Sequence, residues 1–249
     1  MLSRFFFIQG YKMRLNQYIA ACGICSRREA DKLVTAGRVK VNGATAQAGV
    51  QVEETDEVYV DNKKISLVKE NVVLAYYKPV GVVCTEKDSH AERTVISEVK
   101  YPTRVTYAGR LDKDSEGLLI LSNDGNLINA MMKASNKHEK EYEVSVDKEI
   151  SGDFLNRMAN GVYLEELDRT TRGCKVTKTG KKSFRIILTQ GLNRQIRRMC
   201  KALGYNVESL KRIRVMTVKL SDYDIKPGQY VELDKKSIDS LYKACGLKK

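Results

Sequence analysis

The stretch AGRLDKDSEGLLILSNDG, residues 108–125, places an acidic segment around a short apolar run. Residues 118–121 are four consecutive apolar residues, which is typical of a buried strand. The acids that surround this run are Asp112, Asp114, Glu116 and Asp124. They could be ordinary turn residues, metal ligands, an acid and base pair, or one nucleophile with solvated neighbours. The rest of the chain has to distinguish these alternatives.

The segments around this stretch predict an α+β protein with a largely antiparallel sheet. Apolar and polar residues alternate as in half-buried strands at residues 140–147, 174–180, 182–189 and 209–220. Helical spacing is found at residues 125–133, 151–162 and 193–205. Ser151 is a suitable N-cap and Gly161 a suitable stop for the second of these helices. Residues 81–85, GVVCT, are expected to form a further strand.

The charge balance indicates a polyanionic partner. The chain has 249 residues, with 44 Lys and Arg against 31 Asp and Glu, and its isoelectric point is about 9.4. This excess favours nucleic acid over an anionic membrane surface. Six scattered cysteines in a chain of this size indicate a reducing compartment, so we expect a cytoplasmic protein. No apolar stretch approaches the length of a membrane span.

Residues 13–60 are predicted to form a small basic module. Ser26 followed by Glu29 is a capping box, which predicts a helix start. Asn42-Gly43 closes a short alternating strand and indicates a tight turn. Residues 1–12 are expected to be a disordered leader and residues 61–71 a polar linker. The basic residues expected to contact phosphates in this module are Arg27, Arg28, Arg38 and Lys40.

Two of the interpretations of the acidic segment fit poorly. An EF-hand loop that begins at Asp112 would have Gly117 at its sixth position, but Asn123 stands where the bidentate Glu belongs. Its seventh to tenth positions would fall in the predicted strand. A pair of hydrolytic carboxylates at Asp112 and Asp114 would suit a glycosidase, yet the chain contains no Trp to stack on a sugar. We therefore expect no metal site here.

A single nucleophilic carboxylate fits better because a basic helix could be its partner. Residues 193–219 hold eight basic residues and one acid, and Asn193 is a candidate cap for the helix. Arg197 falls on the more apolar side of this helix, where an arginine needs a carboxylate or a phosphate. Paired with Asp112, it would keep that carboxylate ionised. An oriented, ionised Asp can act as a nucleophile.

These motifs resemble a known family. Residues 108–125 and GLNRQIRRMCKALGY, residues 191–205, are similar to the hallmark motifs of the RsuA-like ribosomal RNA pseudouridine synthases. SRREADKLVTAGRVKVNG, residues 26–43, resembles the S4 RNA-binding domain, the usual companion in that family. The sequence of the basic helix and KEYEV, residues 140–144, look closest to the RluF-type branch, which modifies large-subunit RNA. The resemblance covers residues 13–233.

The resemblance implies a fold and a chemistry. The fold would be an α/β-type S4 domain at residues 13–60, then a catalytic domain at residues 72–235 with a mixed, mostly antiparallel sheet. Asp112 would attack the uridine or its ribose, Tyr142 would stack on the base and help remove its C5 proton, and Arg197 would pair with Asp112. No cofactor or metal would be needed. The residues expected to contact RNA at this site are Arg110, Leu111, Lys113, Leu192, Asn193, Arg194 and Gln195.

Further expectations concern the remaining acids, the C-terminus and the partners. Asp114, Glu116 and Asp124 are interpreted as a turn and its solvated neighbours. Residues 236–249 are predicted to be a basic tail, either a short helix or disordered. The expected partner is ribosomal RNA, with a tRNA stem-loop as a second candidate, and the expected state is a monomer without membrane contact. The alternative function is a non-catalytic RNA-binding or ribosome-assembly protein, which would not need Asp112, Tyr142 and Arg197 together.

Overall fold

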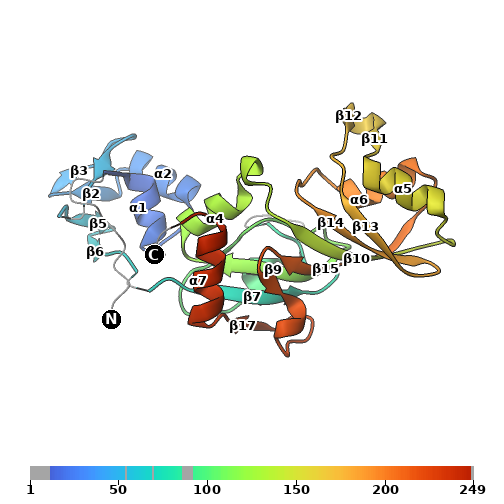
Figure 1. The fold of residues 1–249 in the computed structure, drawn as a ribbon. Helices are drawn as coiled ribbons and strands as arrows, with labels where there is room; N and C mark the ends of the chain where they lie inside the picture. The colour runs from blue at the N-terminus through green and yellow to red at the C-terminus, as the bar shows by residue number, and fades with distance from the viewer. Residues whose placement is uncertain (1–11, 54, 69, 86–91, 248–249) are drawn as a thin grey trace. The chain divides into compact units, whose positions relative to one another are not determined.

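The computed structural model describes residues 12–53, 55–68, 70–85 and 92–247. The chain divides into two compact units (Figure 1). The first unit consists mainly of residues up to Val72, and the second holds nearly all of the remainder. The predicted leader, residues 1–12, lies outside the described residues except for Lys12.

The first unit packs two helices and small sheets around an aliphatic core. Leu15, Ile19, Val39 and Val58 are fully or almost fully buried in that core. A four-stranded sheet has the order β3-β2-β5-β6, and β1 pairs with β4. The elements are β1 (Met13–Arg14), α1 (Leu15–Ala21), α2 (Arg27–Thr35), β2 (Val39–Val41), β3 (Ala44–Thr45), β4 (Gln51–Val52), β5 (Val58–Val60) and β6 (Lys63–Ile65).

Local chemistry determines the turns of this unit. Ser26 caps α2 and forms the predicted capping box with Glu29, so this prediction is confirmed. Asn42 and Gly43 both have positive φ, as a type I′ hairpin turn requires. Asp61 and Asn62 also have positive φ, so they close a second hairpin between β5 and β6. The predicted linker at 61–71 therefore begins too early, because its first residues belong to this sheet.

The second unit is built on one nine-stranded sheet with the order β13-β14-β10-β15-β9-β7-β17 along its main path. Most neighbours are antiparallel, but β15 and β9 pair in parallel over a short register that places Arg212 opposite Gly117. The predicted α+β class with a mostly antiparallel, mixed sheet is confirmed. The strands are β7 (Val73–Lys78), β8 (Thr106–Tyr107), β9 (Glu116–Ser122), β10 (Lys140–Val146), β13 (Lys175–Gly180), β14 (Ser183–Leu188), β15 (Val207–Val215), β16 (Val218–Lys219) and β17 (Tyr230–Glu232).

Helices cover the two halves of this sheet separately, as Figure 1 shows. One core joins β10 and β14 to α5 and α6, and the other joins β7 and β9 to α4 and α7. The parallel pairing of β15 with β9 is where the strand order passes from one half to the other. The remaining elements are α3 (Val95–Glu98), α4 (Gly125–Met132), η1 (Ala134–Asn136), α5 (Gly152–Asn160), β11 (Tyr163–Leu164), η2 (Glu165–Leu167), β12 (Arg169–Thr170), α6 (Gln195–Ala202), η3 (Leu220–Asp222) and α7 (Lys235–Ala244).

Two expectations for this unit need correction. Helix α7 buries Ile238, Leu241 and Tyr242 in the β7–β9 core, so residues 235–244 belong to the unit and do not form a tail. The GVVCT segment contains only one isolated bridge, from Val83 to Thr94, and is not a strand. In contrast, α5 begins after Ser151, whose hydroxyl accepts from the amide of Phe154, as predicted. Within the described ranges, no helix is both long enough and apolar enough to cross a membrane.

Candidate active site

A cleft of about 960 Å³ lies in the second unit and collects most of the predicted site residues. Asp112 and Tyr142 both line it, together with residues from the entry to α6. Asp112 is the only acidic residue in this lining, among the residues that the structure describes, while eight lining residues are basic. These cations are Arg110, Lys113, Lys133, Lys140, Arg169, Arg172, Arg194 and Arg212. The cleft is therefore suited to a polyanion and presents a single carboxylate to it.

The segment that carries Asp112, residues 110–115, is held by hydrogen bonds to its backbone; we call it the Asp112 loop. The Asp112 carbonyl accepts from the amide of Ser115, and the amide of Leu111 donates to the buried thiol of Cys84 at 3.4 Å. Side chains and one amide from distant positions donate to four more of its carbonyls. These donor–acceptor pairs are Arg212 Nη1 to Arg110 O, Gly81 N to Lys113 O, Arg197 Nη2 to Asp114 O, and Lys78 Nζ to Ser115 O.

Lys78 anchors the end of this loop from within the protein. It lies at the end of β7, is fully buried, and donates to the carbonyls of Ser115 at 2.6 Å and Pro79 at 2.9 Å. Burial lowers the pKa of Lys78 to about 8, because the charged ammonium loses its water. A buried ammonium has to find acceptors, and here they are the carbonyl of Pro79 and the carbonyl of Ser115 in the Asp112 loop. This contact fixes the loop to the central sheet.

The arginines pair differently from the sequence prediction. Arg194 Nη1 lies 4.0 Å from Asp112 Oδ2, whereas Arg197 Nε lies 3.4 Å from Asp114 Oδ2. Arg197 is mostly buried and also donates to the carbonyls of Asp114 and Val207. The predicted Arg197–Asp112 pair is therefore replaced by an Arg194–Asp112 pair. Asp114 does lie in a turn and its side chain is 46% exposed, as expected, but it also binds both arginines.

The local backbone explains this exchange. Arg194, not Asn193, is the N-cap of α6, and it has a left-handed φ of 50° with no side-chain cap. The helix therefore starts one residue later than predicted, and Arg194 leaves the helical spiral and reaches the Asp112 loop. The Asn193 carbonyl and its side-chain oxygen instead accept from Arg198. The carboxamide oxygen of Gln195 accepts from the amide of Leu192, which closes the loop before the helix.

The other two acids of the opening stretch also differ from expectation. Glu116 accepts from the hydroxyl of Tyr77 at 3.1 Å, and Asp124 is 4% exposed and accepts from the side-chain amide of Asn71. Asp124 therefore belongs to the packing of the first unit, as does Asn71. Both acids have structural partners and are not free surface charges.

Replacing Asp114 with Asn should lower the free energy of unfolding by about 1 kcal/mol at neutral pH, since its side chain is 46% exposed and solvent screens it. The hydrogen bond from Arg194 is the main cause that lowers the pKa of Asp114 in the folded protein. This stabilisation is complete above the unfolded pKa of about 3.9 and is lost as the pH falls through the lower folded pKa.

Urea unfolding of wild type and Asp114→Asn, from neutral pH down through the folded pKa of Asp114, measures this difference in the free energy of unfolding. The matched control is Asp153→Asn, because the Asp153–Arg157 pair is exposed and its atoms lie 3.7 Å apart. We expect a smaller difference for the control. A difference for Asp114→Asn that stays constant down to the lowest pH would contradict the assigned ion pair.

The predicted phosphate-binding residues of the first unit have mixed surroundings. Arg27 and Arg28 are exposed on α2. Arg38 forms a two-pronged ion pair with Asp61, and Lys40 donates to the side chain of Asn62. All four lie in the first unit and outside the cleft lining. Of these residues, Arg27 and Arg28 keep their charge most available to a phosphate.

Comparison with known proteins decides the family. Residues 72–202 match the model of the RNA pseudouridylate synthase family, and residues 13–58 match the S4 domain. The chain belongs to the RNA pseudouridylate synthase family. It is 44% identical to the dual-specificity RNA pseudouridine synthase RluF of Escherichia coli (strain K12), over 93% of this chain and 79% of that protein. This confirms the predicted resemblance to the RsuA-like synthases of the RluF type.

Two further relatives support the same assignment. The chain is 35% identical to the ribosomal large subunit pseudouridine synthase B of Vibrio cholerae, over 92% of this chain and 74% of that protein. A crystal structure of a pseudouridylate synthase superposes with a TM-score of 0.68 at 27% identity, covering 92% of this chain and 99% of the other. The expected S4 domain and synthase fold are therefore confirmed.

Five basic residues of this pseudouridylate synthase cleft were not predicted from the sequence: Lys133, Lys140, Arg169, Arg172 and Arg212. Arg212 lies in the interior of β15 and Lys140 at the start of β10, and both line the cleft. Arg212 is two residues after the buried Leu210, so the two share one face of the strand. That position was the available signal, because an arginine on a buried face needs partners.

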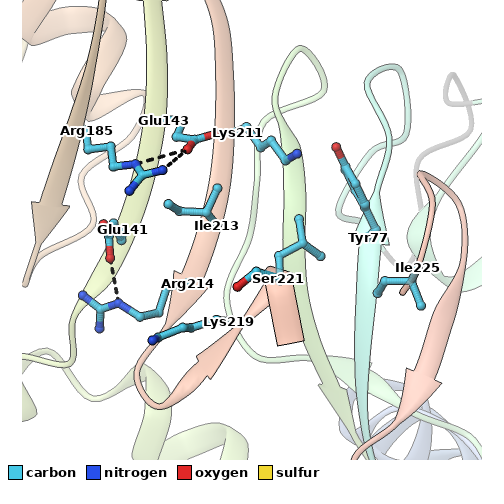
Figure 2. A pocket seen from close by; sticks show the side chains of 11 residues that line it. Tyr77, Glu141, Glu143, Arg185, Lys211, Ile213, Arg214, Lys219, Ser221 and Ile225 are labelled. Atoms are coloured by element: carbon cyan, nitrogen blue, oxygen red, sulfur yellow. Dashed lines mark hydrogen bonds and ion pairs between the residues drawn. The ribbon is translucent and has the colours of Figure 1, made fainter. Parts of the chain in front are cut away.

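A second hollow of about 540 Å³ is found on the opposite face of the same strands of the synthase unit. Figure 2 shows Lys211 extending across it toward Tyr77, and the ammonium of Lys211 lies 5.0 Å from the ring centre. Its two acids are already paired, Glu141 with Arg214 and Glu143 with Arg185. Because successive residues of a strand point to opposite faces, Lys211 lies here while Arg212 lies in the cleft.

Proposed function

We propose that this synthase isomerises uridine in ribosomal RNA, with large-subunit RNA as the target. The observation that carries the proposal is the cleft in which Asp112, the single acid among the described lining residues, stands among eight cations and shares the cavity with Tyr142. The name of one relative, the ribosomal large subunit pseudouridine synthase B, supports the class of RNA. The name of RluF states a dual specificity, and we propose a tRNA stem-loop as the second substrate to test.

Asp112 is proposed as the nucleophile. Its side chain is 30% exposed, so it can meet a substrate while the Asp112 loop fixes its direction. Attack on the uridine or its ribose would break the N1–C1′ bond, and the held base would turn and form the C5–C1′ bond. The proton at C5 leaves and one is gained at N1, so that the product is an isomer of the substrate. Asp112 is the nucleophile, and Tyr142 assists removal of the C5 proton, so the reaction needs no external reagent.

The basic lining is proposed to hold the RNA while the uridine leaves its stack. Removing a base from a helix costs a few kcal/mol, and less in a loop or bulge. Arg110, Lys113 and Arg194 lie beside Asp112 in the lining and can contact the phosphates around it. Leu111 and Leu192 give the same cleft an apolar surface for the base.

Tyr142→Phe should reduce turnover by about 100-fold or more, because the ring is kept but the hydroxyl that assists C5 proton removal is lost. Binding of substrate RNA should change less than about twofold, since stacking on the ring remains. Single-turnover rates and filter-binding affinities of the two proteins measure both quantities. An unchanged rate would contradict a proton-transfer role for Tyr142.

The domain roles are also proposals. The S4 module, which extends from residue 13 through β6, is proposed to add phosphate contacts through Arg27 and Arg28. The second unit, including α7, is proposed to contain the whole reaction centre. We propose a cytoplasmic monomer. A competing function, RNA binding without catalysis, would retain the basic residues but would have no need for Asp112 in the cleft.

A pseudouridine map of ribosomal RNA tests the function. The map is made in cells that lack the gene and carry wild type or Asp112→Ala. The proposal expects one large-subunit site to disappear and to return only with wild type. Purified protein should also form a stable adduct with RNA that contains 5-fluorouridine, which a simple binder does not. Loss of no site, or equal rescue by Asp112→Ala, would overturn the catalytic assignment.

A further inference from the structure

Arg212 has one buried N–H group that no acceptor of the described chain meets. The residue is 1% exposed, yet it lines the cleft. Its Nε donates to the carbonyl of Leu118 at 2.7 Å and its Nη1 to the carbonyl of Arg110 at 3.3 Å. Its Nη2 is buried and meets no acceptor in the part of the chain that the structure describes. A buried charged group with an unmet donor is costly unless a ligand completes it.

Lys140 brings a second cation to the same place. It lines the cleft and is partly buried, and its Nζ is 3.5 Å from the carbonyl of His138. Burial is the main cause that lowers the pKa of Lys140, and the charge of Arg212 lowers it further. Neither has a carboxylate within ion-pairing distance among the described residues. Two neighbouring cations of this kind require an anion.

The register of the sheet places this pair beside Tyr142. Tyr142 on β10 stands directly opposite Arg212 on β15, and Lys140 is two residues before Tyr142 on the same strand face. Directly opposed residues have Cβ atoms about 5 Å apart. An anion bound by Arg212 and Lys140 would therefore lie next to whatever stacks on the ring of Tyr142.

We propose that Arg212 and Lys140 form an anion subsite in the floor of the cleft, which binds a phosphate of the nucleotide whose base stacks on Tyr142. The inference rests on the proposed function, because it takes the cleft's ligand to be RNA. The phosphodiester is the anionic group of an RNA chain, and the planar fork of an arginine suits its oxygens. Arg212 would thus couple the position of the substrate to the Asp112 loop, whose Arg110 carbonyl it also holds.

The test compares uridine 3′,5′-bisphosphate with uridine as ligands of the full chain. Calorimetric or NMR titration gives the affinity of each for wild type, Arg212→Met and Lys211→Met. Lys211→Met is the matched control, because Lys211 is the neighbour of Arg212 on the same strand but lies toward Tyr77 on the other face (Figure 2). Met keeps an unbranched stem and removes the charge in both variants.

Wild type and Lys211→Met should prefer the bisphosphate by about tenfold or more, as charge-assisted hydrogen bonds of this kind allow. Arg212→Met should lose most of that preference, while its binding of uridine changes little. A purely structural role of Arg212 would lower both affinities together and leave the ratio unchanged. An unchanged ratio in Arg212→Met would overturn the subsite.

If Arg212→Met does not fold, the wild-type protein answers the question. The Nε–Hε NMR signal of Arg212, protected by its bond to Leu118, should shift on titration with inorganic phosphate. No shift at saturation would overturn the proposal. Pseudouridine formation on large-subunit RNA is measured in the same preparation. If pseudouridine forms but the protein does not prefer the bisphosphate to uridine, the subsite alone is rejected. If the protein prefers the bisphosphate but no pseudouridine forms, the proposed function alone is rejected.

Discussion

Asp112→Asn should reduce pseudouridine formation by roughly 10⁴-fold or more, because an amide cannot act as the carboxylate nucleophile. The exchange is nearly isosteric, and the carboxylate is 30% exposed with Arg194 at 4.0 Å as its ion-pair partner. Stability and RNA affinity should therefore change little. Tritium release from RNA labelled at the uridine C5 position, under single-turnover conditions, measures the rate.

Asp114→Asn is the internal control for this experiment. Asp114 lies two residues away in the same loop and binds the same Arg194, but it is absent from the cleft lining. We expect its turnover to remain within about tenfold of wild type, since it positions arginines and does not meet the substrate. If Asp114→Asn were as inactive as Asp112→Asn, the nucleophile would have to be reassigned within this loop.

Gly117→Ala should be strongly destabilising, although it adds only one methyl group at the centre of the sheet. A Cβ at Gly117 would lie 2.3 Å from the carbonyl oxygen of Arg212, and Gly117 has a φ of +109° that L side chains rarely adopt. The obstacle is backbone and cannot rotate away. Overpacking and strain together should cost about 3 kcal/mol or more, which lowers the melting temperature by roughly 6 to 12 °C.

The same substitution should also reduce turnover, because the parallel β15–β9 pair at Gly117 aligns Arg212 with the Asp112 loop. Gly152→Ala is the matched control. Gly152 begins α5, its φ is not positive, and a methyl group added there would meet no atom within 4 Å. Its melting temperature should be unchanged or slightly higher. Equal melting temperatures for Gly117→Ala and wild type would contradict the close strand contact.

Parts of the fold and of the candidate site could be predicted from short segments of sequence. Ser26 and Ser151 define helix starts through capping, which depends only on residues a few positions away. The predicted contact residues Arg110, Leu111 and Lys113 do line the cleft beside Asp112. These residues are neighbours of Asp112 in the chain, so a correct prediction for Asp112 also puts them near the site.

The arginine partners could not be predicted because they depend on one backbone angle. The left-handed φ of Arg194 moves the start of α6 by one residue and hence exchanges the partners of Asp112 and Asp114. Arg212 was missed for a different reason. Strand alternation shows that it differs in face from Lys211, but only the pairing of β15 with β10 and β9 determines which face meets the cleft.

The bonds that hold the Asp112 loop reach far along the chain. Three side chains that donate to its carbonyls are distant in sequence. Lys78 lies 37 residues before its acceptor, whereas Arg197 and Arg212 lie 83 and 102 residues after theirs. Contacts of such long sequence separation are slow to form, because a long loop of chain has to close first. On a translating ribosome, the loop cannot take its final shape until Arg212 has left the exit tunnel. The nascent chain therefore gains its RNA chemistry only after β15 has been synthesised and has emerged.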